Sequence, residues 1–165
     1  METEKARKHF RNMPDEVFNL WLHDIIKERG WPFLTENEET LGTNYEKLFN
    51  SLSLSYWTNL HWGIEIIPYD ELVLDDISLQ KAQAIIDEVI LGESVFTTKI
   101  ESMAERYESC VSFVEENNCF PKPIICQFNL DKSLTVVDGH HRLAALKTFR
   151  NIDKFPFWTW IGYPS

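Results

Sequence analysis

The strongest constraint on how this chain folds is the segment of residues 134–146. It begins with a β-branched stretch that is typical of a strand and ends with an Ala/Leu-rich stretch that is typical of a helix, with a few polar residues between them. The apolar, β-branched residues Leu134–Val137 are typical of a buried strand. Asp138 and Gly139 follow, and glycine permits the tight turn that lets a strand pass directly into a helix. The sequence therefore predicts a strand, a turn and a helix in immediate succession.

The start of this expected helix is rich in nitrogen-bearing side chains. The backbone N–H groups of a first helical turn lack partners within the helix, and the helix dipole is positive at this end. Phosphate or carboxylate groups bind readily at such a place. Arg142 is the best candidate for a phosphate contact because its planar fork matches phosphate geometry in a bidentate way. The residues that we expect at this anion site are Asp138, Gly139, His140, His141 and Arg142.

The charged and polar members of this set also have structural alternatives. Asp138 supplies the side-chain oxygen that caps a helix, with or without a catalytic or metal-binding role. Neighbouring histidines on a helix project about 100° apart, so His140 and His141 cannot line one pocket wall in the same way, and a shared metal needs a third ligand. The alternative for Arg142 is a surface salt bridge to a carboxylate, which we rank below the phosphate contact.

The succession of strand, Asp-Gly-His-His-Arg and helix resembles the nucleotide-site motif of the ParB N-terminal/sulfiredoxin-like superfamily, most closely its free-serine-kinase branch. Three further segments resemble the family's opening strand with its Pro-x-x-x-Leu turn, its second strand and its closing strand: Ile66–Leu72, Pro123–Ile125 and Phe155–Ile161. The resemblance implies an α/β (α+β) fold, a small mixed sheet with helices, over residues 64–165. It does not cover residues 1–63, whose periodicity predicts an α-helical extension.

The same resemblance implies a kinase that binds ATP or a related nucleotide with Mg²⁺ and transfers a phosphoryl group to the hydroxyl of a small molecule. Residues 138–142 would hold the phosphates, and Asp138 would also meet the metal ion. Such a transfer needs a carboxylate that orients the acceptor hydroxyl, and Asp75 and Asp76 are the candidates, although the branch prefers the longer Glu there. Asp76 has an ordinary alternative, which is to cap a helix that begins near Ser78.

The residues present argue against two other activities of the superfamily, sulfiredoxin chemistry and DNA partition. Sulfiredoxin chemistry needs a nucleophilic cysteine where His140 stands, and the DNA-partition branch carries Glu and Arg in the two positions after the glycine. Two alternatives to a kinase stay open. One is a non-catalytic module of the same fold that senses a ligand or binds a protein. The other, with less support, is a metal-assisted nuclease.

Composition limits the partners of the chain. Its 165 residues carry a formal net charge of −10, and its pI is near 4.9. This charge argues against DNA as a partner, because a grip on phosphates needs a basic face. We expect a cytoplasmic protein without a membrane span, since no apolar run approaches about 18 residues and the N-terminus does not resemble a signal peptide.

Hydrophobic periodicity predicts the remaining elements. Within residues 1–63 it predicts a helix over 14–29, with Phe18, Trp21, Leu22 and Ile25 on its buried face, and a second helix after Asn44. Farther along it predicts helices near 79–90 and 100–114, strands at 64–67 and 124–128, a hairpin turn at 129–132, and a last strand that is buried on both faces around Trp158 and Trp160. No Gly/Ser/Pro-rich linker precedes Ile64, so we expect the extension to pack on the α/β part as one cooperative unit.

Overall fold

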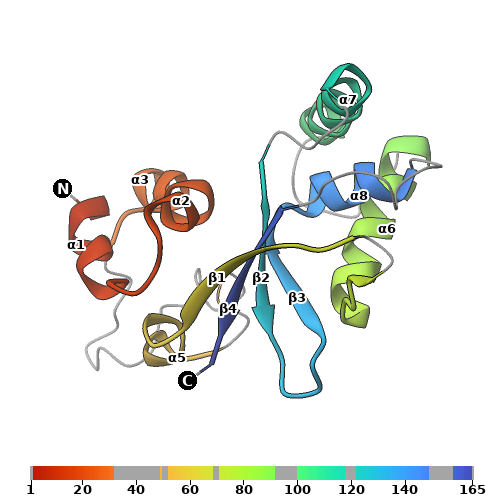
Figure 1. The fold of residues 1–165 in the computed structure, drawn as a ribbon. Coiled ribbons are helices and arrows are strands. Elements are labelled where there is room, and N and C mark those ends of the chain that lie inside the picture. The colour runs from red at the N-terminus through yellow and green to blue at the C-terminus, as the bar shows by residue number, and fades with distance from the viewer. Residues whose placement is uncertain are drawn as a thin grey trace. The chain divides into compact units, whose positions relative to one another are not determined.

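The computed structural model describes residues 2–31, 49, 52–68, 71–91, 100–117, 122–148 and 158–164. The protein is α+β, as the sequence predicts, and its described residues form helices and a four-stranded sheet whose strand order is β1-β4-β2-β3 (Figure 1). The strands are β1 (His61–Ile66), β2 (Ile124–Phe128), β3 (Leu134–Asp138) and β4 (Trp158–Tyr163).

The chain divides into two compact units. The first comprises residues 1–63 together with 161–165, and the second comprises residues 64–160. Residues 161–165, which we expect in the second part of the chain with the rest of residues 64–165, belong to the first unit. Strands β1 and β4 each contain a boundary between the units. The packing of the extension on the α/β part stays a prediction.

The helix predicted over residues 14–29 contains a π-helical turn. The N–H of His23 donates to the carbonyl of Phe18, five residues back. Such a turn inserts one residue more than a regular α-helical turn holds. As a result, Ile26 takes the buried position that regular spacing assigns to Ile25, which is only partly buried. The three successive segments are α2 (Asp15–Val17), η1 (Phe18–Leu22) and α3 (His23–Arg29).

Aromatic side chains form the core of the first unit. Phe10 stacks on Phe49 with ring centroids 6.1 Å apart, and Trp21 contacts the rings of Phe49 and Trp57 at 5.5 and 5.2 Å. The indole N–H of Trp57 donates a 2.9 Å hydrogen bond to the carbonyl of Phe49. Trp57 belongs to the short helix α5 (Leu54–Thr58). These contacts join segments that are distant in the sequence, so the first unit has a core of its own.

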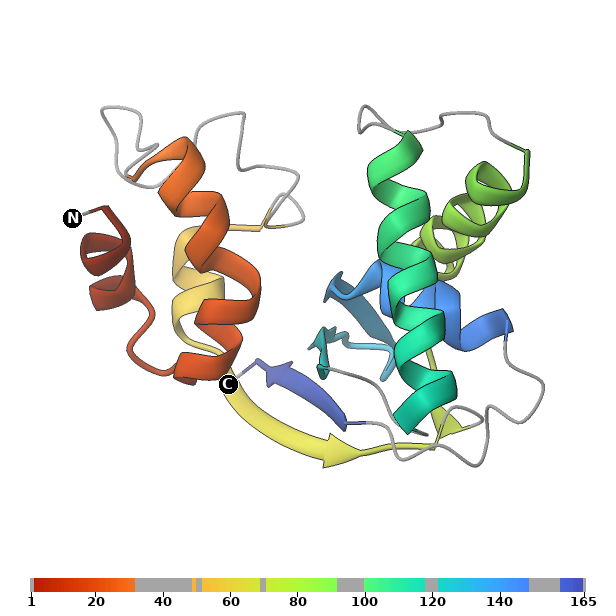
Figure 2. The same cartoon turned by 90° about the horizontal axis from the view of Figure 1, so that it is seen from above.

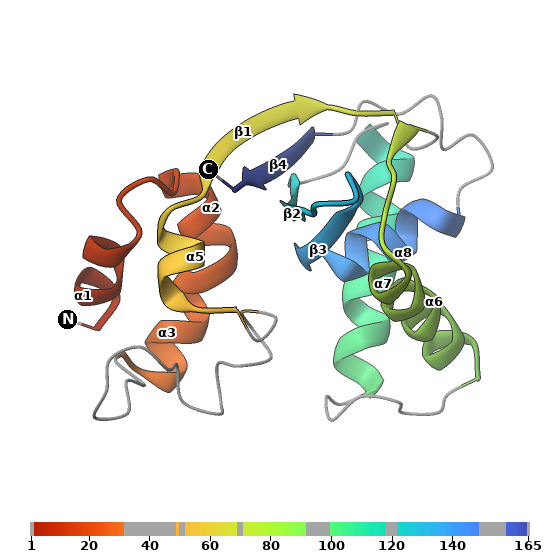
Figure 3. The same ribbon diagram turned by 90° about the horizontal axis from the view of Figure 1, so that it is seen from below.

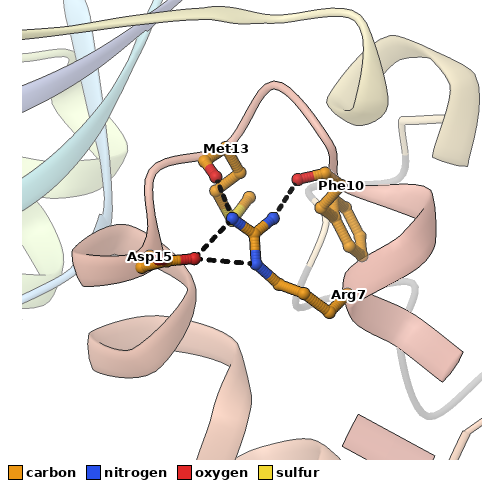
Figure 4. Close-up of polar contacts among 4 residues, drawn as sticks. All are labelled: Arg7, Phe10, Met13 and Asp15. Carbon is orange, nitrogen blue, oxygen red and sulfur yellow. Dashed lines mark hydrogen bonds and ion pairs between the residues drawn. The ribbon is translucent and has the colours of Figure 1, made fainter. Parts of the chain in front are cut away.

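Arg7 connects α1 (Glu2–His9) with the turn that follows it and with α2 (Figure 4). Its guanidinium donates to the carbonyls of Phe10 and Met13 and to the carboxylate of Asp15, with 2.7 Å between Nη2 and Oδ1 of Asp15. It also lies over the ring of Phe18, 5.4 Å from the centroid. Arg7 thus satisfies carbonyl groups beyond the end of one helix and fixes the start of the next.

In the second unit, helices cover one face of β2 and β3 (Figures 2 and 3). These helices are α6 (Asp76–Leu91), α7 (Ile100–Asn117) and α8 (His140–Thr148). Helix α8 packs against both α6 and α7, and it also contacts β2. Buried Ile85 and Ile86 of α6 form a cluster with Ala144 of α8. The start of α8 is therefore held between helices on one side and the hairpin on the other.

Strands β2 and β3 form the predicted antiparallel hairpin. Cys126 lies opposite Val136, and a bulge follows Ile125. In the connecting turn, the N–H of Asn129 donates to the carbonyl of Ser133 at 2.9 Å. The turn through residues 129–132 is thus confirmed, and the register brings the end of β3 beside the beginning of β2.

The expectation that β4 is buried on both faces is wrong for one face. Thr159 and Ile161 are buried, whereas Trp158 on the opposite face is 47% exposed. Side chains alternate between the two faces of a strand, so one covered face suffices to hold it. Two other expectations, the helix after Asn44 and the residues Phe155–Phe157 of the closing strand, lie outside the described residues.

None of the helices in the described ranges combines the length and the apolar character that a transmembrane span requires.

We expect the two units to unfold in one transition, because β1 and β4 each continue from one unit into the other. In a variant with Trp158→Phe and Trp160→Phe, the remaining tryptophans all belong to the first unit, so their fluorescence reports on that unit alone. Far-UV circular dichroism reports on both units. Urea midpoints from the two signals should coincide. Separate midpoints would establish the extension as an independent domain.

Candidate functional site

The turn between β3 and α8 is the centre of the candidate site. Strand β3 ends at Asp138, and the first hydrogen bond of the helix runs from the N–H of Leu143 to the carbonyl of Gly139 at 2.9 Å. Gly139 therefore occupies the capping position, and Asp138 lies one residue before it. The expectation that Asp138 caps this helix is wrong, because the turn uses one residue more between strand and helix than we assigned to it.

Only glycine fits at position 139. Its φ is +102°, a region that residues with a Cβ rarely adopt. A Cβ built there would lie 2.7 Å from Cγ2 of Ile124 and 2.9 Å from Nη2 of Arg142. The missing side chain thus lets the first turn of α8 approach β2 and lets the guanidinium of Arg142 lie against the backbone of the turn.

Arg142 makes its contacts inside the protein. Its Nη2 donates to the carbonyl of Pro123 at 3.0 Å and to Oδ2 of Asp138 at 3.2 Å. The side chain of Arg142 is only 15% exposed. Its Nε–H is buried and has no hydrogen-bond acceptor among the described residues. Arg142 therefore forms an ion pair, but a largely buried one and not the surface salt bridge that was the alternative to a phosphate contact. Together with the hydrogen bond to Pro123, this pair links the end of β3 to the residue that precedes β2.

The carboxyl group of Asp138 responds to opposing influences. Burial raises its pKa, while the neighbouring guanidinium of Arg142, the charge of Lys122 and the N–H of Gly139 act to lower it. Burial dominates, so the net shift of the pKa is upward. The turn is therefore a place where a carboxylate is held partly out of water beside a cation.

His140 is a neutral residue at pH 7. Burial lowers the pKa of its imidazole to about 4, and the nearby positive charge of Lys81 adds to the effect. A hydrogen bond to the backbone of Val136 and the charge of Asp75 act in the opposite direction. Its Nε2 has no hydrogen-bond partner within the described ranges. His140 therefore contributes no positive charge to an anion site, in contrast to Arg142. His141 is partly buried in the same helical turn.

Asp75 is bound to β3 and to the first turn of α6. Its Oδ1 accepts a 2.9 Å hydrogen bond from the N–H of Ser78, and its Oδ2 accepts a hydrogen bond from the hydroxyl of Thr135. Its own N–H donates to the carbonyl of Leu134 at 2.9 Å. Helix α6 begins at Asp76, which is exposed. The cap of this helix is thus Asp75, and the assignment of that role to Asp76 is wrong.

The structure brings two sets of predicted residues together: Asp138 with Arg142, and Asp75 with His140. Asp138 and Arg142 are in direct contact, and Asp75 is near enough to influence the pKa of His140. Sequence reasoning missed the partners that hold these groups, namely the carbonyl of Pro123 and the hydroxyl of Thr135. Asp is a residue type that commonly caps helices, but this signal applies to Asp75 and Asp76 alike, because the donor at residue 78 is a backbone N–H. No local signal identifies Pro123, because it is distant from Arg142 in the sequence.

Among the described residues, no group of three or more His, Cys, Asp and Glu side chains is arranged to hold a metal ion. Asp138 is the predicted ligand, and it supplies one carboxylate. Mg²⁺ that accompanies a nucleotide is usually held by one or two carboxylates together with phosphate oxygens and water.

Comparison with known proteins returned no match to a protein-family model, to a curated protein or to a solved structure.

Gly139→Ala should lower the free energy of unfolding by roughly 2–4 kcal/mol, because it combines an unfavourable φ with a clash against a buried side chain. Urea denaturation measures the change. Gly63→Ala is the matched control, since a Cβ there meets only Tyr163 at 3.7 Å, an ordinary contact. Equal effects of the two substitutions would contradict the steric requirement at position 139.

His140 should give the stability a pH dependence of defined sign. Its folded pKa of about 4 lies below the ordinary value of 6.5, so between these values the unfolded state binds a proton that the folded state does not. The free energy of unfolding therefore falls as pH drops through this range. In urea denaturation at pH 7 and pH 5, His140→Gln should lose less stability than the parent protein.

The raised pKa of Asp138 has the opposite effect on stability, because the free energy of unfolding then rises as pH drops. Asp138 is present in both the parent and His140→Gln, so its contribution largely cancels in the comparison. His61→Gln, at an exposed position of β1, serves as the control and should keep the full loss. The same loss in His140→Gln as in the parent would refute the role of this imidazole.

Proposed function

We propose that the turn between β3 and α8 binds the phosphate groups of a nucleotide such as ATP. The observation that carries this proposal is the position of Arg142. Its guanidinium lies against the backbone of Gly139, at the start of a helix. Backbone N–H groups and the helix dipole attract anions at this end, and the guanidinium beside them is the cationic group best suited to phosphate.

The finer proposal is a small-molecule kinase that acts with Mg²⁺. Asp138 would be the protein's ligand to the ion, and the ion when bound would offset negative charge on the phosphates. Helix α8 and Arg142 would hold and orient the phosphates. The acceptor hydroxyl would attack the terminal phosphorus, its proton would pass to Asp75 or Asp76, and the bond to the bridging oxygen of the departing diphosphate would break. We still expect the protein to be in the cytoplasm, where such nucleotides are abundant.

A second candidate is a non-catalytic module that binds a phosphate ligand without transferring a group. One observation favours it: both oxygens of Asp75 already accept hydrogen bonds, from Ser78 and from Thr135. These two hydrogen bonds cap helix α6 and link it to β3, so they account for Asp75 without a catalytic role. Phosphate binding at the turn is common to both candidates, so it is tested first.

Arg142→Ala should weaken the binding of ATP by about 1.5–3 kcal/mol, the usual size of hydrogen bonds to a charged partner. Isothermal titration calorimetry with Mg²⁺ present measures the dissociation constant. Arg11→Ala removes the same charge at an exposed position of the first unit and should leave the constant unchanged. Because Arg142 also holds Pro123 and Asp138, circular dichroism must first establish that the variant is folded. An unchanged dissociation constant would exclude Arg142 from the site.

Asn variants of Asp75 and Asp76 separate the kinase from the binding module. If one carboxylate orients the acceptor hydroxyl, its Asn variant should bind ATP normally and lose at least about a hundredfold in turnover. Asn retains an acceptor oxygen for Ser78, so Asp75→Asn should still fold. Turnover is followed as ADP release across a panel of hydroxyl metabolites. ATP binding without turnover by the parent protein would favour the module.

A further inference from the structure

The guanidinium of Arg142 offers no free pair of parallel N–H groups to a ligand, because both pairs that a guanidinium can form, Nε with Nη2 and Nη1 with Nη2, include the engaged Nη2. Both hydrogens of Nη2 have acceptors, the carbonyl of Pro123 at 3.0 Å and the carboxylate of Asp138 at 3.2 Å. The Nε–H is buried without an acceptor in the described part of the chain. An arginine binds phosphate best through two parallel N–H groups. In this position Arg142 cannot offer such a pair, because Nη2 is engaged and Nε is covered.

The charge at the turn is also compensated internally. Asp138 places a carboxylate within ion-pair distance of the guanidinium, and its side chain is 32% exposed. An anion that approaches Arg142 is therefore repelled by the carboxylate of Asp138, which offsets the attraction of the guanidinium. The positive end of α8 and the charge of Lys122 remain near, but the residue best suited to phosphate is already paired.

We call the arrangement in which the guanidinium of Arg142 contacts Pro123 and Asp138 the closed position. It leaves one buried donor without an acceptor among the described residues. A buried N–H without an acceptor is rare in folded proteins, and Nε of Arg142 is such a group among the described residues. A phosphate oxygen that reached Nε would supply the missing acceptor. The guanidinium lies over a glycine, so no side chain at position 139 separates it from the backbone N–H groups of the first turn.

We propose that the contact between Asp138 and Arg142 is autoinhibitory: Asp138 holds the guanidinium closed, and a phosphate ligand binds by drawing Arg142 away from it. This inference rests on the phosphate site proposed above. It implies that Asp138 opposes the binding of phosphate when no divalent cation is present, although the same carboxylate would favour binding when a cation accompanies the ligand.

The test is isothermal titration calorimetry with inorganic pyrophosphate in buffer containing EDTA. Asp138→Asn should bind pyrophosphate about tenfold more tightly than the parent, equivalent to about 1.4 kcal/mol. Asp131→Asn is the matched control. It removes the same charge at the hairpin turn, at the opposite end of β3, and should bind like the parent. Equal or weaker binding by Asp138→Asn, with binding by the parent intact, would overturn the inference and leave the proposed function standing.

Binding of pyrophosphate by neither the parent nor Asp138→Asn, in EDTA and with Mg²⁺ present, would overturn the proposed phosphate site and this inference together. A second measurement uses the parent protein alone, in case the variant does not fold. The Nε–H signal of Arg142 in a ¹H–¹⁵N spectrum should move downfield on addition of pyrophosphate, because the donor gains an acceptor. Binding of pyrophosphate with an unmoved Nε–H signal would overturn the opening of the pair.

Discussion

The close approach of helix α8 to strand β2 at Gly139 is the constraint on which the candidate site depends. A Cβ at this position would overlap Ile124, and its absence allows Arg142 to reach the carbonyl of Pro123. Burial of the first turn of α8 follows from the same approach, and that burial lowers the pKa of His140 and raises that of Asp138. One backbone geometry thus shifts the pKa values of the side chains around it.

The secondary structure of the second unit could be predicted because its signals are local. An apolar β-branched stretch before Asp-Gly gave β3, and polar residues between two such stretches gave the hairpin turn. The π-helical turn in the first unit had no comparable signal. Its spacing of apolar residues suits a regular helix, and the shift from Ile25 to Ile26 arises because the aromatic core around Trp21 and Trp57 decides which side chains are buried.

Within the candidate site, the proximity of sequence neighbours could be predicted, whereas the partners that are distant in the sequence could not. Asp138 and Arg142 are four residues apart across a turn, and their contact follows from local geometry. The partner of Asp75, by contrast, is Thr135, sixty residues away. The sequence offered Asp75 and Asp76 as equivalent carboxylates. The tertiary structure distinguishes them, because only the former lies where it can cap α6 and bind β3 at once.

The energetics of the turn bear on the proposed release of Arg142 from Asp138. A buried donor without an acceptor costs about 1–3 kcal/mol, and a partly exposed ion pair returns an energy of about the same size or less. The closed position of Arg142 is therefore held by a small balance of opposing contributions, to which the carbonyl of Pro123 also contributes. A ligand shifts such an equilibrium only through its differential affinity for the two positions. A small balance means that a few hydrogen bonds to an anion are sufficient, whereas a fully satisfied arginine would have to be removed from its partners at a much larger cost.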